Sequence, residues 1–201
     1  MNRLACSAFT ACALLVLMGL WIPLKAVVAQ QLLDLAWARS QAEQGPVRPW
    51  PWADTWPVAR MDWPTLSESM VVLDGASGES LAFGPGRLAG TDDLDGPVIL
   101  AGHRDTHFKR LGDLAPGSPI RLQGRDGRWH DYTVVATRVV DSTQERLAPG
   151  RLPDDSLLLV TCYPFDALRA GGPLRYVVTA KAEKLEATQG TGQSLRGLRV
   201  M

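Results

Sequence analysis

The sequence predicts an all-β domain from residue 58 onward, folded as a barrel or a sandwich. Short runs of apolar or alternating residues recur along this part of the chain, and turn-forming pairs separate them. The best hairpin signal is Asp126-Gly127, which lies between two such runs. We expect strands at residues 58–61, 69–73, 98–101, 119–123, 129–141, 156–161 and 174–182, and a short helical turn within 106–114.

The N-terminal stretch 4–24 is nearly free of charge, and Arg3 and Lys25 bracket it. It has about the ~20 residues that a helix needs to cross a bilayer. Helical periodicity continues through Trp37, so we predict an uncleaved membrane anchor at 1–44 rather than a signal peptide cleaved after Ala29. A Pro- and Trp-rich connector follows at 45–55, and the polar tail 184–201 is predicted to be disordered.

Composition excludes several functions. The chain has 201 residues, 46% of them hydrophobic, which suits one domain with appendages. The net charge is zero and no long basic run appears, so nucleic acid is not an expected partner. No metal or other cofactor is expected: Arg104 follows His103 where a zinc-protease motif needs Glu, and the acidic turn at 92–96 does not match a calcium loop.

Cys162 is the only cysteine outside the apolar N-terminal stretch. It follows the aliphatic run 157–160 and precedes Tyr163-Pro164, where a strand must end. A lone cysteine is commonly a small core residue. However, this one lies at a strand tip, and no second cysteine of the domain could pair with it. The position favours a nucleophile.

Two further residues complete a candidate catalytic set. His103 follows the apolar run 98–101 in the same way that Cys162 follows its own, and an imidazole can act as general acid and base near neutral pH. Acyl transfer also needs a donor for the oxyanion. Arg175, which opens a predicted strand, is a better-fixed donor than Arg169 in the Gly-containing loop 165–173. His130 is expected to be a solvated surface residue.

Taken in this order, three segments resemble the motifs of the sortase family. Ile-Leu-Ala-Gly-His-Arg-Asp at 99–105 is similar to the histidine motif of that family, Leu-Val-Thr-Cys-Tyr-Pro at 159–164 to its cysteine motif, and Leu-Arg-Tyr-Val-Val at 174–178 to its arginine strand. The resemblance covers about 56–183. The phrase that runs from Cys162 to Tyr176 resembles the Gram-negative, marine proteobacterial subgroup most closely.

The resemblance implies a closed eight-stranded β-barrel with short helices, here preceded by the predicted transmembrane helix. It also implies a thiol transpeptidase that cuts a C-terminal sorting signal of the Leu-Pro-x-Thr-Gly type in a protein substrate. Cys162 would attack the Thr carbonyl, His103 would move the protons, and Arg175 would hold the oxyanion. The neighbouring Thr161, Tyr163 and Asp105 are expected to contact the substrate.

The accepting nucleophile, an amine or water, stays open at this point. The expected location is the bacterial inner membrane, crossed once, with the barrel on the periplasmic side, because the few charges favour a cytoplasmic N-terminus. The loops 142–155 and 165–173 flank the predicted cysteine strand and should line the substrate groove. The main alternative is a membrane-tethered β-barrel that binds extended peptides without cleaving them. An L,D-transpeptidase is disfavoured because the histidine and cysteine lie on different strands.

Overall fold

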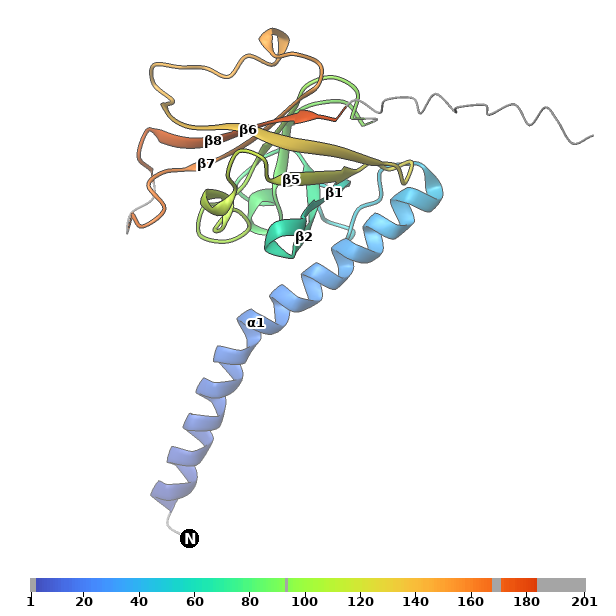
Figure 1. Ribbon diagram of the computed structural model, residues 1–201. Helices are drawn as coiled ribbons and strands as arrows, with labels where there is room; N and C mark the ends of the chain where they lie inside the picture. The colour runs from blue at the N-terminus through green and yellow to red at the C-terminus, as the bar shows by residue number, and fades with distance from the viewer. Residues whose placement is uncertain (1–2, 93, 168–170, 184–201) are drawn as a thin grey trace, which may run out of the picture.

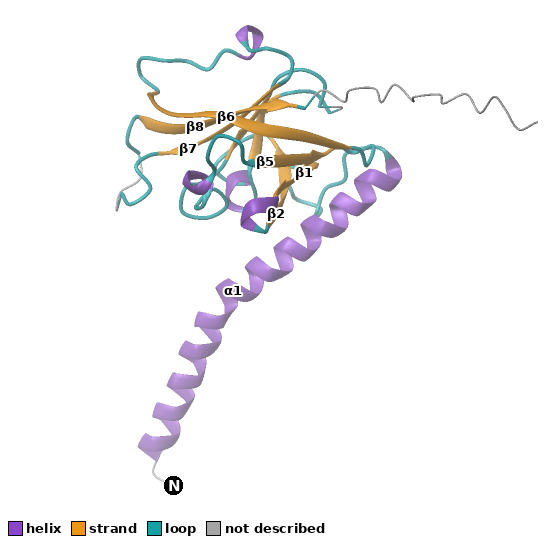
Figure 2. Cartoon of the chain, viewed as in Figure 1, coloured by secondary structure: helices purple, strands orange, loops and turns teal. Residues whose placement is uncertain are grey.

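The computed structural model describes residues 3–92, 94–167 and 171–183. It shows one long helix followed by a closed β-barrel (Figures 1 and 2). The predicted tail 184–201 and the predicted loop residue Arg169 lie outside the described residues. The helix α1 spans Arg3–Glu43, and the barrel strands are β1 Pro57–Trp63, β2 Glu68–Asp74, β3 Gly86–Ala89, β4 Val98–Ala101, β5 Pro119–Gln123, β6 Trp129–Asp141, β7 Ser156–Cys162 and β8 Leu174–Ala182.

The eight strands close in the order β1-β2-β3-β4-β7-β8-β6-β5. The pairs β2–β3 and β4–β7 are parallel, and the others are antiparallel. The predicted closed barrel is therefore confirmed, together with the seven strands expected from the sequence. The strand β3 is not predicted from the sequence, because it has only four residues, begins with glycine and shows no alternation. The predicted helical turn within 106–114 is present as a 3-10 turn at Leu111–Asp113.

The barrel interior is filled by side chains that alternate along the strands. Leu157 and Leu159 of β7 and Val178 and Ala180 of β8 are fully buried in this core, because every second residue of a strand faces the same side of the sheet. Phe108, from the connection after β4, also lies in the core and packs 5.5 Å from Trp63, measured between ring centroids. The core thus holds both the strands and the start of this connection.

The C-terminal half of α1 packs on the outside of the barrel. Its buried residues, at positions 29, 33, 36, 37 and 40, recur every three or four positions and form one stripe. Leu33 and Trp37 of this stripe contact Val71 and Leu73 of β2. The guanidinium of Arg60 on β1 adds an ion pair with Asp34 at 2.6 Å.

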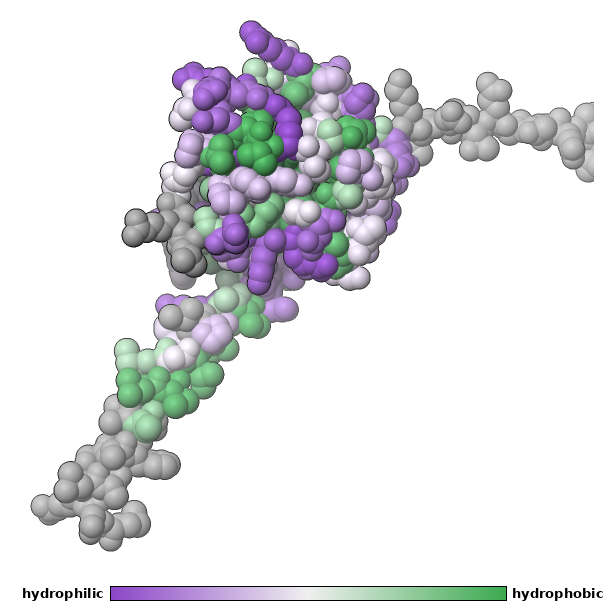
Figure 3. Space-filling model, turned by 60° about the vertical axis from the view of Figure 1, so that its left-hand side comes forward, coloured by the Kyte–Doolittle hydropathy of each residue, from purple (hydrophilic) through white to green (hydrophobic). Residues whose placement is uncertain are grey.

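The N-terminal half of α1 projects away from the barrel, as Figure 1 shows. Its described apolar side chains are exposed, among them Leu15, Met18 and Trp21. Figure 3 shows them as a green stretch below the barrel. The predicted helix is present, but its prediction as a membrane span is not supported: among the described residues, no helix has both the length and the apolar character to cross a membrane.

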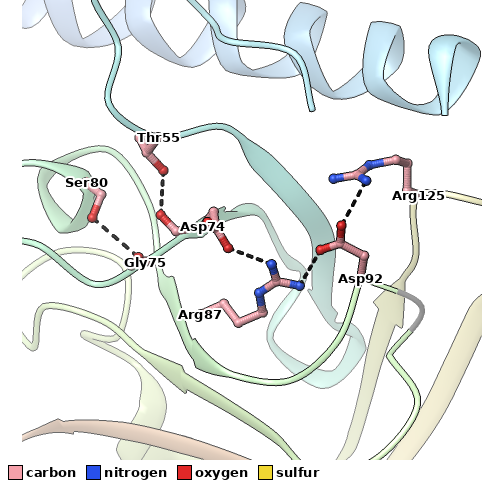
Figure 4. Close-up of polar contacts among 7 residues, drawn as sticks. All are labelled: Thr55, Asp74, Gly75, Ser80, Arg87, Asp92 and Arg125. Atoms are coloured by element: carbon pink, nitrogen blue, oxygen red, sulfur yellow. Dashed lines mark hydrogen bonds and ion pairs between the residues drawn. The ribbon is translucent and has the colours of Figure 1, made fainter. Parts of the chain in front are cut away.

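A partly buried ion-pair network joins strands on the helix-facing side of the barrel (Figure 4). Arg87 of β3 lies between Asp74 of β2, at 2.6 Å, and Asp92, at 2.7 Å. Asp92 also pairs with Arg125 of the β5–β6 hairpin at 3.1 Å. Near this hairpin, the Gln44 side chain just after α1 donates a hydrogen bond to the carbonyl of Arg125. The network therefore links β2, β3 and the β5–β6 hairpin on the side of the barrel where α1 packs.

Candidate active site

Strand register brings the three predicted catalytic residues to one end of the barrel. Cys162, the last residue of β7, lies opposite Arg175 of β8. On its other side β7 runs parallel to β4, with Ala101 opposite Val160, and the Gly102 amide continues the ladder by donating to the Val160 carbonyl at 3.1 Å. His103 lies two residues beyond the end of β4, directly after this bonded glycine. The thiol and the guanidinium are therefore on paired strands, and the imidazole is in the segment that leaves the neighbouring strand.

Cys162 and Arg175 also share the outer face of the sheet. Cys162 has the same strand parity as Leu158, and Arg175 the same as Val177, while His103 follows the strand that carries Ile99. Those apolar residues form a cluster separate from the barrel interior. Cys162 is half-buried and His103 is exposed, so the thiol is not sealed inside the core.

The outer apolar cluster forms a floor beside the candidate site. Ile99, Leu158 and Val177 are buried in it, and Leu147 and Leu152 from the connection 142–155 pack against it. This position agrees with the prediction that the connection 142–155 lines the groove. For the loop 165–173, the structure describes residues on either side of 168–170, which lie outside the description.

An internal hydrogen bond ties the cysteine strand to the histidine segment. Thr161 is 2% exposed, and its hydroxyl donates to the Gly102 carbonyl at 2.7 Å. Gly102 is needed there because an added Cβ would come within 2.7 Å of the Phe108 ring. The hydroxyl of Thr161 is thus engaged in a hydrogen bond within the fold. The expected contact between Thr161 and the substrate stays a prediction.

Arg104 is the residue of this region that the sequence analysis did not select. Its side chain is 5% exposed, although charged residues flank it in sequence. One edge of the guanidinium donates to the carboxylate of Asp105, at 2.9 and 3.2 Å. Nη1 donates to the carbonyl of Pro164 at 2.6 Å, and Nη2, besides its bond to Asp105, donates to the carbonyl of Ala167 at 2.9 Å. Arg104 therefore joins the segment after His103 to the segment after Cys162.

The charges in this cluster influence one another. The hydrogen bond from Arg104 holds the pKa of the Asp105 carboxyl below its ordinary value, and the nearby charges of Arg104 and His103 act in the same direction. The same hydrogen bond raises the pKa of Arg104, with smaller contributions from the charges of Asp105 and Cys162. Asp105 is 68% exposed, so the carboxylate predicted to contact substrate is accessible but already paired.

Arg175 occupies the predicted position but makes local contacts. It is half-buried, and its guanidinium donates to the carbonyls of Gly172, at 2.6 Å, and Leu174, at 2.8 Å. Its strand position opposite Cys162 fits the predicted oxyanion donor. Both of these bonds come from Nη1, and the guanidinium also carries N–H groups on Nε and Nη2.

Aromatic side chains brace the segment that follows Cys162. Tyr163, predicted to contact substrate, stacks on Tyr176 at 6.1 Å and meets the edge of Phe165 at 5.9 Å. The Tyr163 amide donates to the Leu174 carbonyl at 3.0 Å. Phe165 packs against the core and lies so close to Gly112 that an added Cβ there would meet its ring at 2.9 Å.

The other two histidines, His107 and His130, do not belong to the candidate catalytic set. His107 is half-buried, and burial together with the charge of His103 lowers its pKa. His130, expected to be a solvated surface residue, is instead half-buried on β6 with its Nε2 atom enclosed. His130 pairs with Leu122 of β5 near the start of β6. Arg175 lies opposite Val140, near the other end of β6. Within the described residues, no group of three His, Cys, Asp or Glu could hold a metal ion.

A cavity lies elsewhere on the molecule, apart from the candidate site. It has a volume of about 880 Å³ and lies between α1 and the connector, where Trp21, Val28, Trp50 and Phe83 line it. None of the catalytic candidates borders it. The candidate active site is instead defined by the strand ends and the outer apolar cluster.

The features described so far define a class of protein, an all-β barrel with a candidate thiol site at the end of one strand. A family model described as the sortase domain matches residues 61–183. The chain therefore belongs to the sortase family, as its three motifs predict. Members of this family are cysteine transpeptidases that act on peptide bonds.

Individual relatives agree with this family. The chain is 31% identical to sortase D of Bacillus subtilis (strain 168) over 120 residues, which are 59% of this chain and 60% of that protein. The match thus spans less than two thirds of the relative's length. The comparisons do not support the predicted Gram-negative, marine proteobacterial subgroup.

Solved structures share the fold. Sortase A from Corynebacterium diphtheriae is similar with a TM-score of 0.57 and 23% identity, over 68% of this chain and 65% of that one. Sortase A of Listeria monocytogenes is similar with a TM-score of 0.53 and 22% identity, over 64% of this chain and 88% of that one.

Proposed function

We propose that this chain is a cysteine transpeptidase that cleaves a C-terminal sorting signal of the Leu-Pro-x-Thr-Gly type in protein substrates. The observation that carries the proposal is the register of β4, β7 and β8. Cys162, which is half-buried, pairs with Arg175 of β8, and the exposed His103 follows β4, the strand that runs parallel to β7 on its other side. A nucleophile, a group that titrates near neutral pH and a cation are the three parts that acyl transfer requires.

In the first half-reaction, the Cys162 thiolate attacks the carbonyl carbon of the scissile amide and forms a tetrahedral oxyanion. The Arg175 guanidinium would stabilise this oxyanion by hydrogen bonds. When the intermediate collapses, the C–N bond breaks, and the His103 imidazolium gives its proton to the departing amine. The products of this step are a thioester on Cys162 and a free C-terminal fragment.

In the second half-reaction, an incoming amine attacks the thioester. The now neutral His103 accepts a proton from that amine, the C–S bond breaks, and the thiolate and the imidazolium are restored. Water in place of the amine would give hydrolysis by the same steps. The natural acceptor can therefore be identified by which nucleophile resolves the thioester faster.

The outer apolar cluster is the proposed binding surface for the signal peptide. Ile99 and Leu158 are buried in this cluster, and Leu147 and Leu152 pack against it. An extended peptide with apolar residues could bury them there while its scissile bond reaches Cys162. Exchanging the connection 142–155 for that of a relative should change which signal is cleaved, and an unchanged preference would contradict this part of the proposal.

We further propose that the protein works at the bacterial inner membrane with the barrel on the periplasmic side. The support is the exposed apolar surface on the N-terminal half of α1, with Arg3 as a flanking positive charge. In cells, the full-length protein should fractionate with membranes, and protease added to spheroplasts should digest the barrel. A barrel protected in intact spheroplasts and digested only after lysis would contradict the orientation.

The decisive test incubates the full-length protein in detergent with a Leu-Pro-x-Thr-Gly peptide and maps covalent adducts by mass spectrometry. We expect the acyl group on Cys162, its removal by added amines, and no adduct on Cys162→Ala. Cys12→Ala, which alters a thiol exposed on α1, should acylate like the wild type. A Cys162→Ala variant that retains full biological activity would instead support a barrel that binds peptides without cleaving them.

A further inference from the structure

Arg104 is a buried charge at the point where the two catalytic segments meet. Only 5% of its side chain is exposed, and its guanidinium makes four hydrogen bonds. A guanidinium is this deeply buried only when its donors are satisfied, because removing an ion from water is costly. The surrounding acceptors are therefore part of how this end of the barrel is built.

The four hydrogen bonds divide between two functions. The pair to Asp105 neutralises the charge locally, since that carboxylate is the next residue in the chain. The pair to the carbonyls of Pro164 and Ala167 reaches across 60 and 63 residues of sequence to the segment that leaves Cys162. The second pair fixes where the chain goes directly after the nucleophile.

The thiol strand and the histidine segment are joined on both sides of the two candidate residues. Before Cys162 and His103, the connection is the β4–β7 ladder, extended by the hydrogen bonds of Gly102 with Val160 and Thr161. After both residues, the connection is made by Arg104. Without Arg104, the segments that leave Cys162 and His103 would be held from the ladder side alone.

We propose that Arg104 is a positioning residue that holds His103 and Cys162 at their working separation by clasping the segment after the cysteine to the segment after the histidine. The inference rests on the proposed catalytic roles of those two residues. Proton transfer between imidazole and a reacting group tolerates little displacement, and about 1 Å of misplacement can cost ~10²-fold in rate. Loss of the clasp therefore reduces the chemical step more than it reduces peptide binding.

A lysine cannot replace this arginine. A planar guanidinium offers five donors in a fixed fork, whereas an ammonium is a compact point charge that cannot reach a carboxylate and two separate carbonyls at once. Arg104→Lys keeps the charge and most of the buried volume but loses the fork. It therefore separates the effect of charge from the effect of geometry.

The test compares Arg104→Gln and Arg104→Lys with Arg110→Gln as a matched control. Arg110 lies in the same connection and also pairs with acidic residues, but 45% of its side chain is exposed. The rate of acyl-adduct formation on Cys162 is measured at saturating and at limiting peptide. Both Arg104 variants should lose at least about 30-fold in the saturated rate with KM changed less than about threefold, and Arg110→Gln should stay within about twofold of the wild type.

Chemical rescue provides a second readout that a merely structural role would not move. In Arg104→Ala, millimolar guanidinium should restore part of the acylation rate by filling the vacated site, whereas sodium chloride at equal ionic strength should not. This measurement also covers the case in which Arg104→Gln folds poorly, because rescue is measured on the folded fraction.

Three results would overturn the inference: wild-type acylation by Arg104→Gln, wild-type acylation by Arg104→Lys, or a defect confined to KM. Failure of the proposed function looks different. In that case neither the wild type nor Arg110→Gln forms an adduct on Cys162, whatever the Arg104 variants do.

Discussion

The catalytic end of the barrel and its helix-facing side both contain buried arginines, but they use them differently. At the helix-facing side, Arg87 is surrounded by the carboxylates of Asp74 and Asp92, so the charges compensate one another (Figure 4). At the catalytic end, Arg104 has one carboxylate and two backbone carbonyls as partners. The first arrangement fastens strands, whereas the second determines the path of a loop.

The apolar contacts differ in the same way. On the helix-facing side, Leu33 and Trp37 are buried against β2 and add to stability. At the catalytic end, the outer apolar cluster lies beside a half-buried thiol and an exposed imidazole. We therefore expect mutations on the helix-facing side to change stability and mutations at the catalytic end to change the reaction rate.

The largest expected effect is at the catalytic end. His103→Asn removes the general acid and base, so the rate of transpeptidation should fall about 10²- to 10⁴-fold. The exposed position of His103 predicts little change in the free energy of unfolding. His130→Asn, at the far end of β6, should keep its rate within about twofold. An equal loss of rate in both variants would remove the distinction between the two regions.

Next in size is the contact between α1 and β2. Leu33 is fully buried there, and Leu33→Ala should lower the free energy of unfolding by about 2–5 kcal/mol in a denaturant titration, if helix and barrel unfold together. Leu35, two residues on, is 52% exposed, and Leu35→Ala should change the value by less than about 0.5 kcal/mol. Acylation of Cys162 in the folded Leu33→Ala protein should proceed normally. A slower rate would show that the docked helix influences the catalytic end.

A smaller loss of stability is expected from the ion-pair network. Arg87→Gln leaves Asp74 and Asp92 without their shared partner. Those carboxylates are 30% and 49% exposed, so the loss should be about 1–3 kcal/mol, below that of a fully buried pair. Arg121→Gln breaks the exposed pair with Asp131 and should cost less than about 1 kcal/mol. Thermal unfolding of the two variants side by side checks the order, and equal losses would contradict it.

The smallest effect is a pH dependence of the same network. Burial raises the pKa of Asp92, but the hydrogen bonds and charges of Arg87 and Arg125 outweigh burial and leave it below the ordinary value. The stabilisation is therefore complete above the unfolded pKa of about 3.9 and is lost as the pH falls toward the lowered folded value. The difference in unfolding free energy between the wild type and Asp92→Asn should shrink from pH 7 to pH 3. A difference that is constant over this range would contradict the assignment.

Much of this protein could be predicted from local sequence. The turn pair Asp126-Gly127 marks the β5–β6 hairpin, and the aliphatic run before Cys162 marks β7. The strand β3 could not be found in this way, because its four residues are held by pairing with β2 and β4 rather than by their own propensity. The half-buried state of His130 also depends on neighbours that are remote in sequence.

The same division applies to the site. Cys162, His103 and Arg175 were selected because each stands at the edge of a predicted strand and has a side chain suited to acyl transfer. Arg104 gave no such signal, since an arginine beside an aspartate normally indicates a solvated turn. Its partners at Pro164 and Ala167 become neighbours only when β4 and β7 pair in parallel.

Side-chain chemistry and strand periodicity are local properties of the chain, so the family, the positions of most strands and the three candidate catalytic residues could be inferred from the order of amino acids. Which faces and ends of those strands meet, how α1 packs on β2, and that a buried guanidinium links the two catalytic segments became known from the folded arrangement. Register and burial arise from contacts between residues far apart in sequence, whose energies no single segment contains.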